Sequence, residues 1–356
     1  MKKKTILFFS KSPMNYVMFQ PIHQRMKNDS KIAFQFTGKP EEHYHSLEEI
    51  YRPFFSSHEE TLSRLFFARW TRPDIYISSD IFLACPWAKI KLHTFHGVSF
   101  KGKAFSNKIL KYDRIFIIGD YMLRRFIEKK ILSENDPRIL KVGMPKTDRL
   151  VNGSLDKSAI LRSLGLSGKR PVVIYAPTWR GASSLNTMGE AIFQKMKTLD
   201  MDFLVKLHDL SLNPKINIKD WGKRLTELED EHIKVIRDPD IIPYLFVSDL
   251  LISDASSTAN EFTLLDRPII FMDVPGLFKK YSETIDLDTW GRKIGVVAKS
   301  AEELPGLIAH SLNHPDEMSE VRKAAARDIF YNHGFATDAA VKALYTLLNL
   351  DPQGTE

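Results

Sequence analysis

Short apolar runs that alternate with helical patterns constrain the fold of this chain more than any other feature. Runs of three to six residues, separated by helical stretches, are typical of βαβ units around a parallel sheet. The predicted strands are Thr5–Ser10, Ile32–Phe36, Ile75–Ser78, Leu92–Phe95, Arg114–Ile118, Ile139–Val142, Pro171–Ala176, Phe203–Leu207, Lys234–Ile236, Leu250–Ser253, Pro268–Met272 and Gly295–Val297. Helices are predicted between them, for example over Thr61–Trp70 and Tyr121–Lys130.

The strands fall into two series, and each series predicts one doubly wound, Rossmann-like α/β domain. Turn-forming residues cluster between Asn152 and Lys169, which predicts the domain boundary there. We expect a first domain over residues 1–155, a second over 165–335, and a cleft between them. By analogy with other two-lobed folds, the last predicted helix, Thr337–Leu348, and the tail to residue 356 cross back to the first domain.

Composition indicates a globular protein in a reducing compartment. Hydrophobic residues make up 43% of the 356 and charged residues 27%, and the single cysteine, Cys85, excludes an intrachain disulfide. No apolar run approaches the ~20 residues that cross a bilayer. The run after the first lysines is too short for a signal peptide and predicts a strand instead. We expect a cytoplasmic protein.

The net charge of +7 is concentrated in one part of the chain. Residues 101–149 contain 13 Lys or Arg and 6 Asp or Glu, a surplus of seven. Such a basic stretch favours an anionic partner, either a phospholipid surface, a phosphorylated acceptor or a nucleic acid. Solvated helix faces explain the surplus equally well. Nucleic acid is the weakest alternative, because the stretch contains no nucleic-acid recognition motif, and we expect no nucleic-acid partner.

The sequence LLISDASSTANEF, residues 250–262, carries the strongest local signal. Asp254, Ser256 and Ser257 form a polar turn between a predicted strand and a helix, where free backbone N–H groups and hydroxyls suit a diphosphate. Glu261 lies one helical turn further on and is placed to accept hydrogen bonds from ribose hydroxyls. The alternative is ordinary N-capping of a helix by Asp254 or Ser256.

Two other strand ends in the second half carry groups that bind anions. In VVIYAPTWRG, Thr178 and Arg180 follow the strand, and an arginine there is suited to neutralise phosphate. In FLVKLHD, Lys206 and His208 are two residues apart at a strand end, and His208 becomes a candidate donor to a leaving phosphate. A salt-bridged arginine and a structural histidine are the alternatives.

In the first half, LHTFHGVSFKGK places His96 at the end of an apolar strand. An imidazole there is our candidate base for an acceptor hydroxyl, because its pKa lies near working pH. The following residues Gly97, Lys101 and Lys103 are the candidate contacts for acceptor or phosphate. In VGMPKTDRL, Asp148 is expected to be a simple charge on a helix surface.

Several functional motifs are absent from the sequence. It contains no Walker A sequence, no GxGxxG at the first strand and no GxSxG elbow, which argues against P-loop, dinucleotide and α/β-hydrolase enzymes. The pair Asp238 and Asp240 has the spacing of a metal-binding DxD but is better interpreted as a turn and cap. We therefore predict no essential metal and no cofactor, with positive charges and helix ends in that role.

In this order, the chain carries the motifs HGVSFKGK, GMPKTD, YAPTWR, KLHD, SDASS and RPIIFMD. With these motifs, residues 90–345 resemble the CDP-glycerol glycerophosphotransferase family, the teichoic-acid primases and polymerases. The resemblance implies a glycosyltransferase-B fold. It also implies that an acceptor hydroxyl attacks the β-phosphate of a CDP-linked glycerol, ribitol or similar polyol, releases CMP and leaves a phosphodiester.

The resemblance also implies roles for individual residues. His96 matches the family's acceptor-side base, and His208 matches its phosphate-binding histidine. Ser256 and Ser257 match the donor turn, and Arg180 matches the arginine of YAPTWR. The expected partners are a CDP-polyol donor and a lipid-linked or surface-glycan acceptor. We expect the protein to lie on the inner face of the membrane as a peripheral protein, docked through the basic stretch to anionic lipid.

The chain departs from the family pattern at three places. KLHP is KLHD here, the tyrosine of SDYSS is Ala255, and the following aromatic–Asp pair is Asn260 and Glu261. With a glutamate at that position, the chain is similar there to UDP-sugar enzymes of the same fold, including UDP-GlcNAc 2-epimerases. A UDP-sugar glycosyltransferase or epimerase is therefore the second hypothesis, and a non-catalytic protein that binds nucleotide or glycan is the third.

Overall fold

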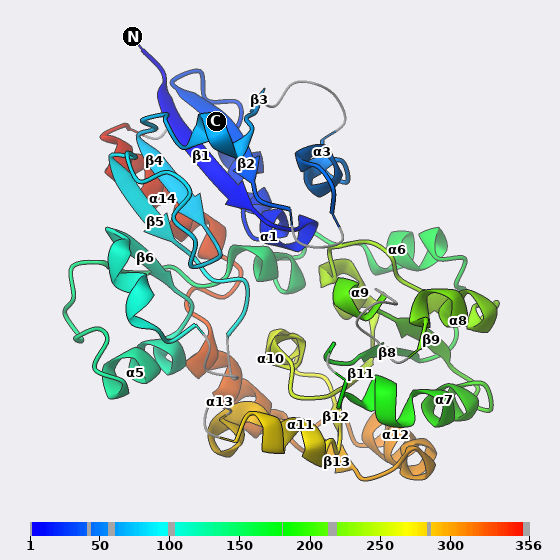
Figure 1. The fold of residues 1–356 in the computed structure, drawn as a ribbon. Coiled ribbons are helices and arrows are strands. Elements are labelled where there is room, and N and C mark those ends of the chain that lie inside the picture. Colours follow the sequence, from blue (N-terminus) through cyan, green and yellow to red (C-terminus); the bar gives the residue numbers. More distant parts are fainter. Residues whose placement is uncertain are drawn as a thin grey trace. The chain divides into compact units, whose positions relative to one another are not determined.

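The computed structural model describes residues 2–40, 44–55, 61–98, 104–179, 181–212, 219–282 and 286–351. The chain divides into two compact units, each built around its own parallel sheet (Figure 1). The first unit contains Met1–Val98, Lys103–Asp148 and Asp328–Glu356, and the second contains Ser99–Gly102 and Arg149–Arg327. The acceptor and donor roles that the sequence assigned to the two halves stay predictions.

A seven-stranded parallel sheet forms the centre of the first unit, in the order β3-β2-β1-β4-β5-β6-β7. Its inner strands are buried apolar runs, because helices cover both faces of a sheet of this kind. The strands are β1 (Lys4–Ser10), β2 (Ile32–Gly38), β3 (Thr61–Leu62), β4 (Ile75–Ser78), β5 (Ile90–His93), β6 (Arg114–Ile117) and β7 (Ile139–Lys141).

The helices of the first unit come from three separate parts of the chain. They are α1 (Pro13–Val17), α2 (Gln20–Met26), α3 (Leu47–Tyr51), α4 (Leu65–Ala68), α5 (Asp120–Glu128) and α14 (Ala336–Leu348), with the 3₁₀ helices η1 (Asn107–Lys111) and, at the boundary of the unit, η2 (Pro145–Leu150). Aromatic rings fill much of the core, and the Phe36 ring centroid lies 5.5 Å from that of Phe8 and 5.4 Å from that of Tyr51.

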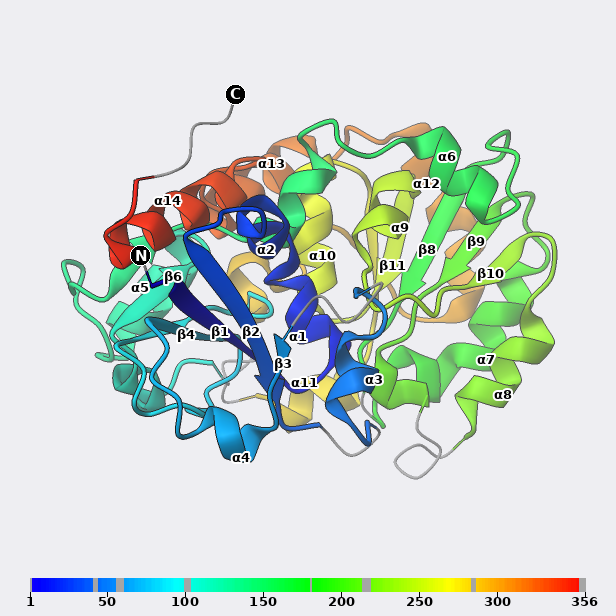
Figure 2. The same cartoon turned by 90° about the horizontal axis from the view of Figure 1, so that it is seen from above.

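The last helix, α14, packs onto the first unit although it follows the whole second unit in sequence (Figure 2). It contacts α2 and buries Ala340 and Leu344 in the aromatic core. The Tyr345 hydroxyl donates a hydrogen bond to the Asp29 carboxylate at 2.7 Å. This arrangement confirms the prediction that the C-terminal helix returns to the first domain.

A six-stranded parallel sheet forms the second unit, in the order β10-β9-β8-β11-β12-β13. Its strands are β8 (Val172–Ala176), β9 (Asp202–Val205), β10 (Ile233–Val235), β11 (Leu250–Ser253), β12 (Ile269–Met272) and β13 (Val296–Ala298). The helices are α6 (Lys157–Ser163), α7 (Ser184–Met196), α8 (Trp221–Leu228), α9 (Ile242–Val247), α10 (Ser257–Phe262), α11 (Pro275–Lys280), α12 (Leu304–Asn313) and α13 (Ser319–Ile329). Shorter turns are η3 (Asp209–Leu212), η4 (Thr263–Leu265), the π-helix η5 (Leu287–Gly291) and η6 (Ala301–Glu303).

All twelve predicted strands are present, and most agree with the structure to within two residues. The expected strand Leu92–Phe95 is shifted, because β5 ends at His93 and Phe95 leaves the sheet to pack against the rings of His93 and Phe126. None of the helices in the described parts of the chain is both long and apolar enough to span a bilayer.

The predicted helix Thr61–Trp70 is wrong. The structure has the two-residue edge strand β3 there, followed by the four-residue helix α4. The Arg64 side chain makes no N-cap hydrogen bond, and Pro73 follows soon after the helix. The large apolar side chains Phe66, Phe67 and Trp70 are exposed and pack against no core, so no buried stripe extends the helix.

Candidate active site

The strand order of each sheet marks the position where a ligand is expected. In the second unit the chain runs outward from β8 through β9 to β10, and then returns to the other side of β8 at β11. In open α/β sheets, ligands bind outside the carboxyl ends of the strands at such a switch point. Thr178 follows β8 there, and Asp254 follows β11. Lys206 and His208 follow the neighbouring strand β9, so these four of the predicted donor-side residues lie at this edge.

Asp254 ties together the loops at this switch point. Its carboxylate has no exposed surface, and Oδ2 accepts hydrogen bonds from the backbone N–H groups of Thr178 at 3.1 Å and Ser184 at 3.2 Å. Burial, together with the Asp254 charge, raises the pKa of Tyr175 well above its usual value. The geometry supports a role for Asp254 in positioning the loop after β8, and direct contact with a donor stays a prediction.

Lys206 and His208 have different surroundings although they are two residues apart. Lys206 is buried, and its Nζ donates to the Leu207 carbonyl at 3.0 Å. Burial lowers the pKa of Lys206, and the negative charges of Asp209, Asp238 and Asp240 oppose that shift.

The half-buried His208 is held in one tautomer. Its Nδ1 accepts a hydrogen bond from the Leu210 backbone N–H at 3.2 Å, and its ring lies 5.7 Å from that of Trp179. When Nδ1 accepts, neutral His208 carries its proton on Nε2. His208 is therefore a hydrogen-bond donor through Nε2, which is the property required for contact with a phosphate.

The serine turn precedes α10. Ser256 is the N-cap, and its hydroxyl accepts from the Thr258 N–H at 3.3 Å, so the capping alternative is present in the structure. Ser256 and Ser257 remain partly exposed, whereas Glu261 is buried. The predicted donor contacts of the two serines and of Glu261 with ribose stay predictions.

His96 lies in the first unit, three residues beyond β5, and is exposed. Its Nδ1 is 3.1 Å from the carbonyl oxygen of Ser79, just past the end of β4. Because a carbonyl only accepts hydrogen bonds, Nδ1 carries the proton and Nε2 is left as the acceptor. A base needs an unprotonated nitrogen, so this contact prepares His96 for that role. The following residue, Gly97, is buried.

Asn15 supports Ser79, and sequence reasoning did not identify either residue. The Asn15 side-chain amide donates to the Ser79 hydroxyl at 2.9 Å, and both residues are buried. They lie at the carboxyl ends of β1 and β4, which is the switch point of the first sheet. The signal was present in the sequence: Ser12, Pro13 and Asn15 form a capping pattern directly after a predicted strand.

The Asp148 expectation is wrong. Asp148 is not a surface charge but is buried, and burial raises its pKa despite hydrogen bonds that favour the charged form. Its Oδ1 accepts from the Ala336 N–H at 3.0 Å and its Oδ2 from the Thr337 N–H at 2.7 Å. Asp148 therefore caps the N-terminus of α14. The sequence could not show this, because the two segments are distant in the chain.

The pair Asp238 and Asp240 forms the turn that the sequence predicted. Asp238 accepts from the Asp240 N–H at 2.9 Å, and Asp240 accepts from the Ile242 N–H at 3.0 Å and pairs with Arg149. Among the described residues, no group of three or more His, Cys, Asp or Glu is arranged to hold a metal ion. Three further predicted site residues, Arg180, Lys101 and Lys103, lie outside the residues that the structure describes.

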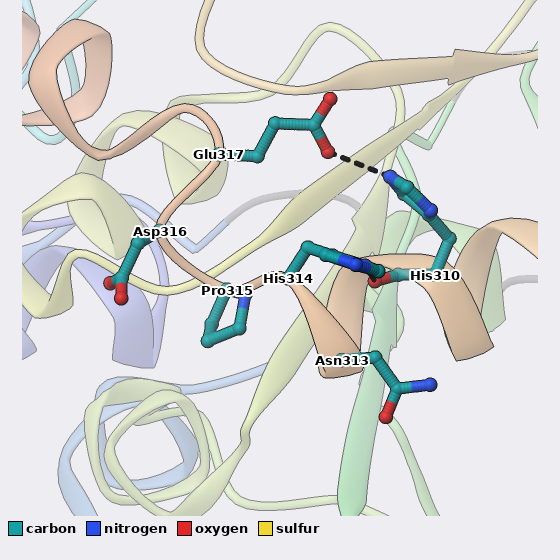
Figure 3. Close-up of a pocket in the computed structure, with 6 residues that line it drawn as sticks. All are labelled: His310, Asn313, His314, Pro315, Asp316 and Glu317. Atoms are coloured by element: carbon teal, nitrogen blue, oxygen red, sulfur yellow. Dashed lines mark hydrogen bonds and ion pairs between the residues drawn. The ribbon is translucent and has the colours of Figure 1, made fainter.

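A surface pocket of the second unit lies at the C-terminus of α12. Its walls include His310, His314 and Glu317. The His310 ring points toward the Glu317 carboxylate, and His310 Nε2 lies 2.7 Å from Glu317 Oε2 (Figure 3). An adjoining hollow is lined by Ile269 and Val296, the first residues of β12 and β13. The pocket therefore adjoins the amino end of the sheet, opposite the edge where α/β ligands bind. We assign it no part in the active site.

Comparison with known sequences supports the family. A model described as CDP-Glycerol:Poly(glycerophosphate) glycerophosphotransferase matches residues 1–344. Over 249 residues the chain is 26% identical to the teichoic acid glycerol-phosphate primase of Bacillus spizizenii. That alignment covers 66% of this chain and 58% of the primase, so the chain spans less than two thirds of this relative's length.

Comparison with solved structures supports the fold. A variant of the wall teichoic acid polymerase TagF has a TM-score of 0.71 at 17% identity, over 98% of this chain and 90% of that chain. A UDP-N-acetylglucosamine 2-epimerase has a TM-score of 0.59 at 14% identity, over 100% of this chain and 99% of that chain. These likenesses confirm the glycosyltransferase-B type of fold. Since the family model covers nearly the whole sequence, the chain belongs to the CDP-glycerol:poly(glycerophosphate) glycerophosphotransferase family.

Proposed function

We propose that this chain transfers glycerol phosphate or ribitol phosphate from a CDP-linked donor to a hydroxyl of a membrane-linked or cell-surface glycan acceptor. One observation carries the proposal: a serine turn, a buried lysine and a histidine that donates through Nε2 lie at one switch point in a member of this family. The name of the primase relative and a TagF structure described as soaked with CDPG support the same chemistry.

On the donor side, the second unit supplies positive charge and hydrogen-bond donors. The acceptor oxygen attacks the β-phosphorus, and the bond from that phosphorus to the oxygen of CMP breaks. CMP leaves with the bonding electron pair, and His208 Nε2–H donates a hydrogen bond to the phosphate that takes this charge. Lys206 stabilises the same charge from a buried position, where an electrostatic interaction is stronger than in water.

On the acceptor side, His96 takes the proton. Its Nε2 accepts the hydrogen of the acceptor hydroxyl while the Ser79 carbonyl holds Nδ1–H. The resulting imidazolium keeps the hydrogen bond to Ser79, so the ring needs no reorientation during the reaction. Such a displacement depends mainly on positioning and on neutralising charge.

The test is release of CMP by the purified chain from CDP-glycerol or CDP-ribitol, with a lipid-linked glycan acceptor. We expect CMP to appear in step with a phosphodiester on the acceptor. Thermal unfolding with CDP, CMP, UDP, GDP and ADP is the companion measurement, since a ligand at 100 times its Kd stabilises the folded state by about 2.7 kcal/mol. Stabilisation by CDP or CMP supports the proposal, and stabilisation by UDP alone contradicts it.

Glu261 favours a second candidate, a glycosyltransferase or epimerase that uses a UDP-sugar. It replaces the acidic partner of the family pattern at a buried position of α10. The epimerase likeness shows that the fold is compatible with such enzymes. Turnover of UDP-sugars without turnover of CDP-polyols selects this candidate, and Glu261→Gln then abolishes the turnover.

We also propose that the protein acts at the inner surface of the cell membrane as a peripheral protein, because the proposed acceptor is membrane-linked. The basic stretch 101–149 is a weaker source of attachment than its composition predicts. Several of its cations are neutralised in the structure, including Arg124 by Asp328 at 2.6 Å and Arg138 by Asp136 at 2.9 Å.

A further inference from the structure

Four large aromatic side chains of the first unit are exposed without a partner in its core. The exposed fractions are 70% for Phe66, 62% for Phe67, 66% for Trp70 and 55% for Trp87. Single exposed apolar residues are common, but four rings on two neighbouring segments mark an interaction site. We call them the aromatic surface. Figure 2 shows α4, which carries Phe66 and Phe67, on the outside of the first unit.

Two hydrogen bonds to backbone carbonyls hold the two segments of the aromatic surface together. Cys85 Sγ donates to the Thr71 carbonyl at 3.3 Å, and the Lys89 N–H donates to the Pro73 carbonyl at 3.0 Å. The chain next to Trp70 therefore runs beside the chain next to Trp87. Ala68 and Cys85 are buried beneath, so the segments are anchored while the rings face solvent.

Cations accompany the rings. Arg64, Arg69 and Arg72 are exposed, and none forms an ion pair with another of the described residues. The segment 61–73 contains no Asp or Glu. Glu59 and Glu60 precede this segment and lie outside the described residues. Lys89 is also exposed but pairs with Asp74 at 2.7 Å.

We infer that the aromatic surface and its three arginines dock the protein on an anionic lipid bilayer. A Trp ring is stable at the boundary between headgroups and acyl chains, where its indole N–H and its apolar body are both satisfied, and Phe rings are buried among the acyl chains beside it. Each arginine near an anionic surface adds to the attraction. Unpaired guanidinium groups interleaved with aromatic rings complement phosphate headgroups above hydrocarbon. This docking surface rests on the proposed function in one respect, because docking brings the enzyme to a membrane-linked acceptor.

The first experiment measures flotation of the full chain with vesicles of phosphatidylglycerol and phosphatidylcholine, and with phosphatidylcholine alone. The aromatic variant is Phe66→Ser, Phe67→Ser and Trp70→Ser, and the arginine variant is Arg64→Gln, Arg69→Gln and Arg72→Gln. We expect each to lower partitioning onto anionic vesicles about tenfold or more. High salt weakens binding of the wild type and leaves the arginine variant little changed.

The matched control removes three exposed lysines of the basic stretch instead, Lys108→Gln, Lys111→Gln and Lys129→Gln. It removes as much charge as the arginine variant and binds as the wild type does. The inference is overturned if the lysine variant loses vesicle binding while the aromatic variant binds vesicles as well as the wild type does. A wild-type dimer that becomes monomeric in the aromatic variant without lipid also overturns it, since a second copy then covers the rings.

Further measurements distinguish lipid docking from effects on folding and on catalysis. Unchanged circular dichroism and melting temperature show that the variants fold. Trp70→Phe with brominated lipid identifies insertion, because it removes part of the fluorescence quenching seen in the wild type. CMP release with a soluble acceptor stays at the wild-type rate in both variants. If no CDP-polyol turns over while vesicle binding follows the expected pattern, the proposed function fails and the docking surface stands.

Discussion

The Asp148 carboxylate accepts a hydrogen bond from the Thr337 backbone N–H at 2.7 Å, across 189 residues of sequence. The same carboxylate also caps Ala336, so the N-terminus of α14 is fixed to η2, the turn that follows β7. This contact holds the C-terminal segment in the unit whose core it completes, with Leu344 buried.

Replacement of Asp148 by Ala is expected to lower the free energy of unfolding by about 1–2 kcal/mol, the upper range for a lost helix cap. The backbone N–H groups of Ala336 and Thr337 then lose a buried partner. Urea unfolding measures the change. Asp338→Ala in the same helix is the control, because Asp338 is exposed and its ion pair with Arg25 is a surface contact. Equal losses in the two variants contradict the cap.

Replacement of His96 by Ala is expected to lower kcat by roughly 10²–10⁴ and leave donor affinity nearly unchanged. In the proposed mechanism His96 takes the acceptor proton, and it belongs to the unit that does not hold the predicted donor residues. Single-turnover CMP release and calorimetric binding of CDP measure the two effects. His310→Ala, in the pocket of Figure 3, is the matched control and keeps wild-type activity. A large loss of CDP affinity in His96→Ala contradicts the assignment of donor binding to the second unit and of acceptor activation to the first.

Replacement of Asn15 by Asp is expected to reduce kcat about tenfold, or 1.4 kcal/mol in the barrier, with KM nearly constant. Asp keeps the acceptor that binds the Lys11 and Ser12 N–H groups but loses the donor to Ser79. The Ser79 carbonyl then holds the His96 ring less firmly, and fewer molecules have Nε2 placed to accept the proton. An unchanged kcat, in a variant of normal stability, rules out a positioning role for Asn15.

Lys206 gives a pH dependence to donor binding. Burial lowers its pKa below the usual 10.5, so its positive charge is lost at a lower pH than that of an exposed lysine. We expect CDP affinity to fall at alkaline pH in the wild type, measured by calorimetry. Lys206→Arg removes this fall, because arginine stays protonated, and Lys206→Met weakens binding at every pH. If the CDP affinity of the wild type changes with pH as little as that of Lys206→Arg, Lys206 does not bind the donor as proposed.

Glu190 gives a pH dependence to stability. The Arg224 guanidinium donates to it through Nε and Nη2, and with Lys219 lowers its pKa from 4.5 to about 2. A lowered acid pKa stabilises the folded state above pH 4.5, and the contribution is lost as pH falls toward 2. Since Glu190 is partly exposed, Glu190→Gln costs only roughly 0.5–1 kcal/mol at pH 7.

Urea unfolding between pH 7 and 3 measures this contribution, with Glu227→Gln as the control. Glu227 reaches the same arginine by one longer contact, at 3.3 Å, so its replacement changes stability less. The difference between wild type and Glu190→Gln shrinks as the solution is acidified. A difference that stays constant with pH shows that the ion pair is not its source.

The sequence predicted the placement of the candidate residues in the second unit better than in the first. Strands β8, β9 and β11 are apolar runs with polar residues directly after them, so Thr178, Lys206 and Asp254 could be placed at one edge from parallel-sheet geometry alone. In the first half, β5 ends two residues earlier than predicted, and the support of His96 by Ser79 comes from a different strand. Hydrogen bonds between loops of different strands leave no periodic signal in a sequence.

The sequence by itself determined two Rossmann-like sheets, their strands, the return of the last helix and the family, because these follow from hydrophobic periodicity and from motifs contiguous in the chain. Only the tertiary structure decided that Asp148 caps α14, that Asp254 holds the β8 loop, and that Phe66, Phe67 and Trp70 are exposed. The reason is physical. Burial and hydrogen-bond partners depend on which segments pack together, and residues far apart in sequence set that packing.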